Sequence, residues 1–173
     1  MKKLLMAFAI LCSVPVLSAE PDFYAALCAW APGQIPMSSG SVIWGVRGTL
    51  FYGDCTRLNG FDLAFFGANR VRERFNGFAI APVFNRANST AGATLSVANV
   101  VENEFYGFQN GLWDHAGFGH GFQCGLVNTA GYFAGLQVGL FNWADDLDGL
   151  QLGLINVIAD QAICVFPFLN IGF

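Results

Sequence analysis

Apolar and polar residues alternate along most of the chain in short segments that recur at a nearly constant spacing. Residues 121–128, 135–142 and 149–156 read GFQCGLVN, GLQVGLFN and GLQLGLIN, so the period there is fourteen residues. Within each unit the apolar side chains occupy every second position, which is the period of a β-strand. Glycine at two positions of every unit would cost about 1 kcal/mol each in a helix interior, so a helix is excluded.

Further units precede and follow these three at steps of 14 to 17 residues, which brings the number of visible units to nine. Turn-like stretches rich in Asn, Asp, Gly and Ser separate the units, for example residues 86–91 and 143–148. Each repeat is therefore predicted to be one strand plus one connection. The additional units are residues 45–52, 60–68, 77–85, 92–99, 107–114 and 163–170.

Two all-β architectures can stack such units. The favoured prediction is a small antiparallel up-and-down β-barrel of about 8–10 strands, in which each repeat crosses a bilayer once. The alternative is a β-solenoid of about nine short repeats, in which the recurring Asn would form a stacked ladder. A solenoid coil needs at least two turns, and only one polar cluster per repeat is visible, which favours the barrel. Residues 23–30 supply either a further strand or a short helix.

The two faces of the predicted strands differ in chemistry. One face is apolar and could contact lipid, with Thr94, Ser96 and Asn110 as its exceptions. The other carries Gly at the strand start, then a polar residue, then Gly or Ala, which suits the interior of a narrow barrel. Arg47 and Asp62 both hold the polar place, so they are expected to be buried close together and paired. The residues in that place are Arg47, Asp62, Gln109, Gln123, Gln137 and Gln151.

The first residues have the pattern of a secretory signal. Lys2 and Lys3 form a charged start, residues 4–17 are apolar but too short to span a membrane as a helix, and Ser18 or Ala19 offers a small residue for cleavage. This start predicts export and a location at the outer membrane or cell surface.

Residues 1–19 are thus assigned to a signal peptide, 20–41 to an N-terminal segment with a first strand and loop, and 42–173 to a β-repeat domain. Cleavage would remove both lysines and leave six arginines against twelve acids, a mature net charge of −6 that disfavours nucleic-acid binding. The chain is 54% hydrophobic and 12% charged. No mature segment has about eighteen uninterrupted apolar residues, which excludes a helical membrane span.

Four cysteines follow the signal, an even number that in an oxidising compartment permits two disulfides with three connectivities. Small apolar side chains packed in a wall are the other interpretation of the same residues. The sequence leaves both open. The four are Cys28, Cys55, Cys124 and Cys164.

The only two histidines, His115 and His120, flank a Gly-rich connection next to Asp114. An Asp-His pair on a barrel rim can serve as a base for a nucleophile or as part of a metal site. The same three residues are also a common accident of a polar turn. We therefore predict no metal, no cofactor and no catalysis, and keep these residues as candidates only.

Arg70, Arg72 and Arg74 hold half of the mature basic charge in one connection. Guanidinium groups bind phosphate in a bidentate geometry, so the cluster could contact anionic lipid headgroups. A solvated loop is the simpler interpretation.

The fourteen-residue unit GLQ-Φ-GL-Φ-N, with the closing stretch 167–173, resembles the leptospiral-type surface-repeat family of exported and surface proteins. Residues 46–53 and 58–63 resemble the entry of that family into its repeat array. The resemblance covers about residues 42–173, and it is weaker over 77–99. It implies a surface or envelope location and supplies no activity and no catalytic residues.

These patterns lead to one expected function and two alternatives. We expect a small outer-membrane β-barrel with a structural or surface-interaction role and with outer-membrane lipid as its partner. A secreted or peripheral β-solenoid for adhesion or binding is the alternative. A membrane-embedded lipid hydrolase or acyltransferase that uses Asp114, His115 and His120 is the third hypothesis.

Overall fold

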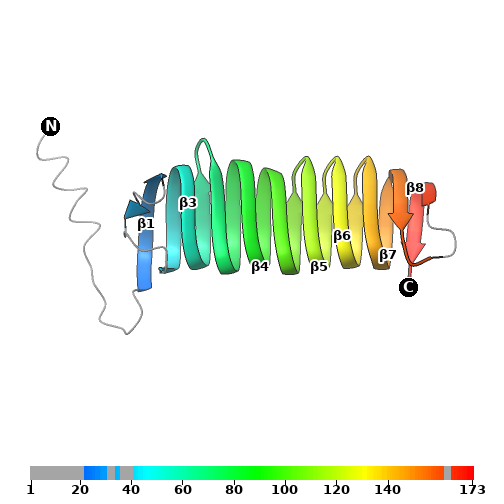
Figure 1. Cartoon of the computed structure of the whole chain (residues 1–173), viewed down its shortest axis with the longest axis horizontal. Helices are drawn as coiled ribbons and strands as arrows, with labels where there is room; N and C mark the ends of the chain where they lie inside the picture. Colours follow the sequence, from blue (N-terminus) through cyan, green and yellow to red (C-terminus); the bar gives the residue numbers. More distant parts are fainter. Residues whose placement is uncertain (1–21, 31–33, 36–40, 162–164) are drawn as a thin grey trace, which may run out of the picture.

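The computed structural model describes residues 22–30, 34–35, 41–161 and 165–173, and all of its regular secondary structure is β-strand. The repeats wind into a β-solenoid of about 7 full turns of the chain, each of which we call a coil (Figure 1). The predicted signal peptide, residues 1–19, lies outside the described residues. The strands are β1 Asp22–Trp30, β2 Gln34–Ile35, β3 Val42–Ala64, β4 Ala68–Asn110, β5 Trp113–Cys124, β6 Val127–Val138, β7 Phe141–Ile158 and β8 Val165–Gly172.

Successive coils pair in parallel, from β1 on β3 through to β6 on β7. The favoured antiparallel up-and-down barrel was therefore wrong, and the alternative, a β-solenoid, describes the fold. In a barrel each repeat would reverse the direction of its predecessor, whereas here each repeat completes a full coil. Repeats thus stack residue on residue, for example Leu136 on Phe122 and Leu150 on Leu136.

The turns of the coil explain why the sequence favoured the wrong architecture. One turn in each coil lies at a glycine with positive φ, such as Gly135 at +139°, and the strand continues on both sides of this residue. The other is a bend at an apolar pair such as Gly139-Leu140. Neither contains a polar cluster, so a search for polar turn residues does not find them.

The positive-φ glycines also allow adjacent coils to approach closely. A Cβ on Gly135 would lie 2.1 Å from the carbonyl oxygen of Gly121 in the preceding coil. Any other residue would have to shift the backbone and adopt a left-handed conformation. Eight glycines repeat this arrangement at consecutive coils: Gly45, Gly60, Gly77, Gly92, Gly107, Gly121, Gly135 and Gly149.

Each coil has two sides. We call the residues from the positive-φ glycine to the next ladder Asn the apolar side, for example residues 136–141. Those from that Asn to the following glycine form the polar side, for example residues 143–148. Alternate side chains of both sides point inward, because successive residues of a strand face opposite ways.

The interior contains two hydrogen-bonded ladders of amide side chains. On the apolar side, Gln137 Nε2 donates to Gln123 Oε1 at 2.7 Å, and Gln151 Nε2 donates to Gln137 Oε1 at 2.8 Å. At the edge of the polar side, Asn128 Nδ2 donates to Asn142 Oδ1 at 2.7 Å. All of these side chains are fully buried. Hydrogen bonds from coil to coil offset the cost of burying so many polar groups.

The prediction that Thr94 and Ser96 lie on the apolar face is wrong. Thr94 is buried, and Ser96 two residues on donates a hydrogen bond to Asn99 Oδ1. Both side chains therefore belong to the inward-facing set. Asn110 does lie in the outward column of the apolar side, where it pairs in register with Cys124.

Apolar residues fill the rest of the interior in two clusters. In the second cluster a small residue makes room for its large neighbours, since Gly119 lies between Phe105 and Phe133 in register. A Cβ on Gly119 would lie 2.4 Å from the Phe133 ring, so this ring fills the space that a side chain at position 119 would need. Such interlocking gives the coils a fixed spacing.

Antiparallel strands close the two ends of the stack. Residues 23–30 lie in strand β1, which pairs in parallel with β3 and antiparallel with β2. Strand β8 pairs antiparallel with β7. The last predicted repeat, residues 163–170, is thus not a further coil in its described part, because Val165–Gly172 runs back along the coil before it. Closed ends of this kind limit end-to-end strand pairing.

Candidate functional site

The apolar side is the most extensive surface feature of the solenoid. Its outward side chains form columns along the axis, and the register aligns Phe108, Phe122, Leu136 and Leu150 in one of them. At the bends a second column is about half exposed, at 46–57%. That column consists of Leu112, Leu126, Leu140 and Leu154.

No charged side chain points outward from the apolar side in the coils that the structure describes. Its two charged residues, Arg47 and Asp62, are 1% exposed and face the interior. The stack from Gly45 to Gly149 contains seven intervals of about 4.8 Å and so spans about 34 Å along the axis, and residues 136–140 add about 13 Å across. An uncharged area of roughly 34 by 13 Å is comparable with the largest apolar patch of an ordinary monomer, and such patches often have a function.

The polar side carries the exposed charges. Arg57 Nε lies 2.7 Å from Glu73 Oε2, and Arg86 Nε lies 2.6 Å from Glu102 Oε1, each pair linking neighbouring coils. These pairs are exposed to solvent, so each contributes at most about 1 kcal/mol. The polar side therefore combines exposed ions with exposed aromatic side chains such as Trp44, Phe118 and Trp143, whereas the outward side chains of the apolar side carry no charge.

The structure places the three predicted headgroup arginines on the polar side. Arg72 Nε donates to Asp54 Oδ1 at 3.0 Å, and this hydrogen bond raises the Arg72 pKa. Arg70 and Arg74 are exposed and make no ion pair within the described part of the chain. All three lie on the opposite side of the coil from the apolar columns.

The structure does not bring Asp114, His115 and His120 together. Asp114 faces the interior and is fully buried, whereas its neighbour His115 faces outward, where Nδ1 lies 3.0 Å from Thr129 Oγ1. Burial lowers the His115 pKa. The His120 ring stacks on Tyr106 at a centroid distance of 4.8 Å. Among the described residues, no three His, Cys, Asp or Glu side chains lie close enough to hold a metal ion.

Asp114 replaces an asparagine in the interior ladder. Asn99 Nδ2 donates to its Oδ1 at 2.7 Å, but its Oδ2 has no hydrogen-bond partner. Asn128 Oδ1 of the next coil also lacks a partner. Both orphan oxygens lie beside Gly125, at 3.0 and 3.1 Å from the position that a Cβ on this glycine would take. Burial raises the pKa of Asp114 to about 7, and a protonated Oδ2 could donate to Asn128.

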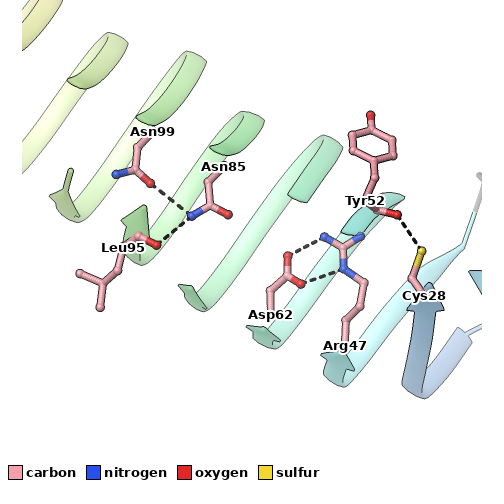
Figure 2. Close-up of polar contacts among 7 residues, drawn as sticks. All are labelled: Cys28, Arg47, Tyr52, Asp62, Asn85, Leu95 and Asn99. Carbon is pink, nitrogen blue, oxygen red and sulfur yellow. Dashed lines mark hydrogen bonds and ion pairs between the residues drawn. The ribbon is translucent and has the colours of Figure 1, made fainter. Parts of the chain in front are cut away.

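Arg47 and Asp62 form a buried ion pair between the first two coils (Figure 2). Arg47 Nε donates to Asp62 Oδ1 at 2.8 Å, and Nη2 donates to Oδ2. Burial alone would lower the Arg47 pKa, but the adjacent carboxylate outweighs it and raises that pKa. The pair occupies the column that Gln109, Gln123 and Gln137 fill further along, so an ion pair substitutes there for the amide ladder.

A groove lies on the polar side over the first five coils. Its volume is about 480 Å³. Trp44, Asn59 and Asn76 line it, each directly before one of the stacked glycines, and Asn76 Nδ2 donates to Asn59 Oδ1 at 2.6 Å. No motif in the sequence marks these residues, and their one shared signal is the place directly before a stacked glycine. The other lining residues are Val42, Arg57, Glu73, Arg74, Ser89 and Glu104.

Three of the four cysteines that follow residue 19 lie in the described residues, and all three are free thiols. Cys28 donates to the carbonyl oxygen of Tyr52 at 2.9 Å (Figure 2) and Cys55 is fully buried, so these two pack as small apolar side chains. Cys164 lies outside the described residues.

Native-state thiol labelling should distinguish these cysteines. Burial raises the Cys55 pKa to about 12, and the reactive thiolate is therefore scarce at pH 8. Iodoacetamide should modify the half-buried Cys124 at least about tenfold faster than Cys55, as measured by peptide mass spectrometry. Unfolding in urea should remove the difference. Equal rates in the folded protein would contradict the burial of Cys55.

Among the described residues there is no helix of the length and apolar character needed to cross a membrane. No family model, curated protein or solved structure matches the chain.

Proposed function

We propose that the protein is an exported, peripheral β-solenoid that lies on lipid with its apolar side and presents its polar side for binding at the cell surface. The observation that carries this proposal is the uncharged apolar side, which runs along every coil from Val46 to Leu154. Strand β8 continues it, since Leu169 and Ile171 are each 45% exposed. Transfer of such side chains from water to hydrocarbon is favourable by about 25 cal/mol per Å².

The shape of the apolar side favours a fluid partner over a second copy of the chain. In its first column Ala93 stands between Phe78 and Phe108, and in the next column Gly48 precedes Leu63. The surface is therefore uneven from one coil to the next. Acyl chains adapt to such relief, whereas a rigid sheet packed against it would leave cavities.

The distribution of charge indicates what kind of lipid is needed. Arg70, Arg72 and Arg74 point away from a bilayer on the apolar side, and the mature chain carries a net charge of −6. Attraction to anionic headgroups therefore adds nothing to the binding. Association should be driven by hydrophobic burial and should not depend on salt.

Vesicle flotation tests this proposal. Mature protein should float with phosphatidylcholine vesicles in roughly 0.1 M and roughly 1 M NaCl alike, because screening does not weaken hydrophobic burial. The triple variant Leu126→Glu, Leu140→Glu, Leu154→Glu should lose at least about tenfold in vesicle binding, because three charges would enter the hydrocarbon boundary. All three positions are exposed, so the fold should survive.

A matched control places the same charge on the other side. The variant Val100→Glu, Phe118→Glu, Ala134→Glu adds three carboxylates to the polar side and should float like the wild type. The oligomeric state of both proteins should be measured by light scattering after size exclusion. A wild-type dimer that the apolar-side variant converts to a monomer, with no flotation of either protein, would refute the proposal. That result would assign the apolar side to self-association.

A further inference from the structure

The groove on the polar side combines one aromatic surface with closely spaced polar groups. Trp44 is 49% exposed and forms one end, while the amides of Asn59 and Asn76 lie beside it on the next two coils. The hydrogen bond between these amides uses one donor and one acceptor and leaves the others available to a ligand.

The charged groups of the groove balance each other. Arg57 is paired with Glu73, and Arg74 and Glu104 are exposed without an ion pair in the described part of the chain. Two guanidinium groups thus face two carboxylates, and a polyanion would gain no net attraction. Among the described lining residues the only exposed apolar group is the indole, so a purely apolar ligand is not favoured either.

The dimensions of the groove indicate an elongated ligand. Trp44 and Glu104 lie four coils apart, which corresponds to about 19 Å along the axis. The volume of about 480 Å³ falls within the range of ligand sites, and the lining is open to solvent on the outer face of the sheet.

From this geometry we infer that the groove lined by Trp44, Asn59 and Asn76 binds a neutral linear oligosaccharide that lies along the solenoid axis. Sugar hydroxyls both donate and accept hydrogen bonds, which matches a mixture of amide, guanidinium and carboxylate groups. The C–H face of a pyranose ring is apolar and can stack on an indole. The site is on the opposite side of the coil from the proposed lipid contact and does not depend on it.

Calorimetry with the full mature chain tests the inference. The probes are linear neutral hexasaccharides of glucose, with α and β linkages, and of N-acetylglucosamine, in the absence of lipid. At least one should bind and change the tryptophan fluorescence. Trp44→Ala should weaken that binding at least about tenfold, and Asn76→Ala at least about threefold, since each removes a ligand contact.

A second tryptophan supplies the matched control. Trp143 is 38% exposed on the polar side but lies outside the groove, so Trp143→Ala should bind like the wild type. Circular dichroism establishes that each variant is folded, and Trp44→Phe, which keeps an aromatic face, should retain most of the binding. Absence of binding to every hexasaccharide, or equal loss in Trp143→Ala and Trp44→Ala, would overturn the inference. Binding of inorganic phosphate in place of the sugars would do so as well.

Discussion

Replacement of Asp62 by alanine is expected to lower the free energy of unfolding by about 3–5 kcal/mol, because it leaves the buried Arg47 guanidinium without its counter-charge. Arg47 is 1% exposed, and Asp62 accepts both of its side-chain hydrogen bonds. Urea denaturation followed by circular dichroism measures the loss. Since each coil contacts only its neighbours, hydrogen exchange should accelerate most in the first coils.

Two controls test whether the loss of stability in Asp62→Ala comes from the buried, unpaired charge of Arg47 and not from the removal of a carboxylate as such. Glu73→Ala breaks the exposed pair with Arg57 and should cost no more than about 1 kcal/mol. The double variant Arg47→Met, Asp62→Leu removes both buried charges and should recover most of the stability lost in Asp62→Ala. A loss in Asp62→Ala as small as that in Glu73→Ala would show that Arg47 reaches solvent.

Replacement of Asp114 by asparagine should stabilise the protein at pH 8 by about 2–4 kcal/mol and have little effect near pH 4. The folded-state pKa of about 7 lies above the value of about 3.9 expected for an unfolded chain. Folded protein therefore holds a proton that the unfolded chain releases, and the wild-type stability falls as pH rises from about 4 through 7. The amide introduced by Asp114→Asn carries no charge at any pH and would supply the missing donor to Asn128 Oδ1.

The measurement is the free energy of unfolding by urea at several pH values between about 4 and about 8.5, which brackets the fall in stability. The slope with pH should be smaller in Asp114→Asn than in the wild type. Asp148→Asn provides the control, because its side chain is exposed and takes no part in the ladder. Equal slopes in the wild type and in Asp114→Asn would mean that the pKa of Asp114 is the same in the folded and in the unfolded chain.

The repeat itself contained the information on which side chains face inward. Because side chains alternate along a strand, the glutamines and small residues had to lie on one face and the leucines on the other, whatever the fold. The same alternation put Arg47 and Asp62 in one column, where they pair. The glutamines of the repeat are accordingly all buried, and the leucines at the bends are exposed: Gln109, Gln123, Gln137 and Gln151 against Leu126, Leu140 and Leu154.

The direction of the strands was not contained in that alternation. A barrel strand and a solenoid coil both give a period of fourteen residues with two faces, and they differ only in how many turns a repeat makes. The second turn lies at residues such as Gly139 and Leu140, whose letters also fit a continuous strand. The stacked Asn ladder was the clue that pointed to the solenoid.

The candidate sites likewise divide into features that the sequence suggests and features that only the fold creates. Sequence proximity suggested that Asp114 and His115 act together, but neighbouring residues of a strand point to opposite faces, and only one of the two reaches solvent. Trp44, Asn59 and Asn76 are far apart in sequence and belong to no motif. They meet in one groove because each occupies the same place in consecutive coils.

The sequence by itself determined the repeat, the all-β class and the chemistry of the two strand faces, because these depend only on local alternation and on residue type. Tertiary structure alone decided that repeats run in parallel, that the apolar residues gather on one side of the coil, and that Asp114 and Asn128 meet as two unpaired acceptors. Those features depend on where the chain turns and on which residues are stacked one coil apart. Both are set by contacts between residues about fourteen or more positions apart, which no local pattern specifies.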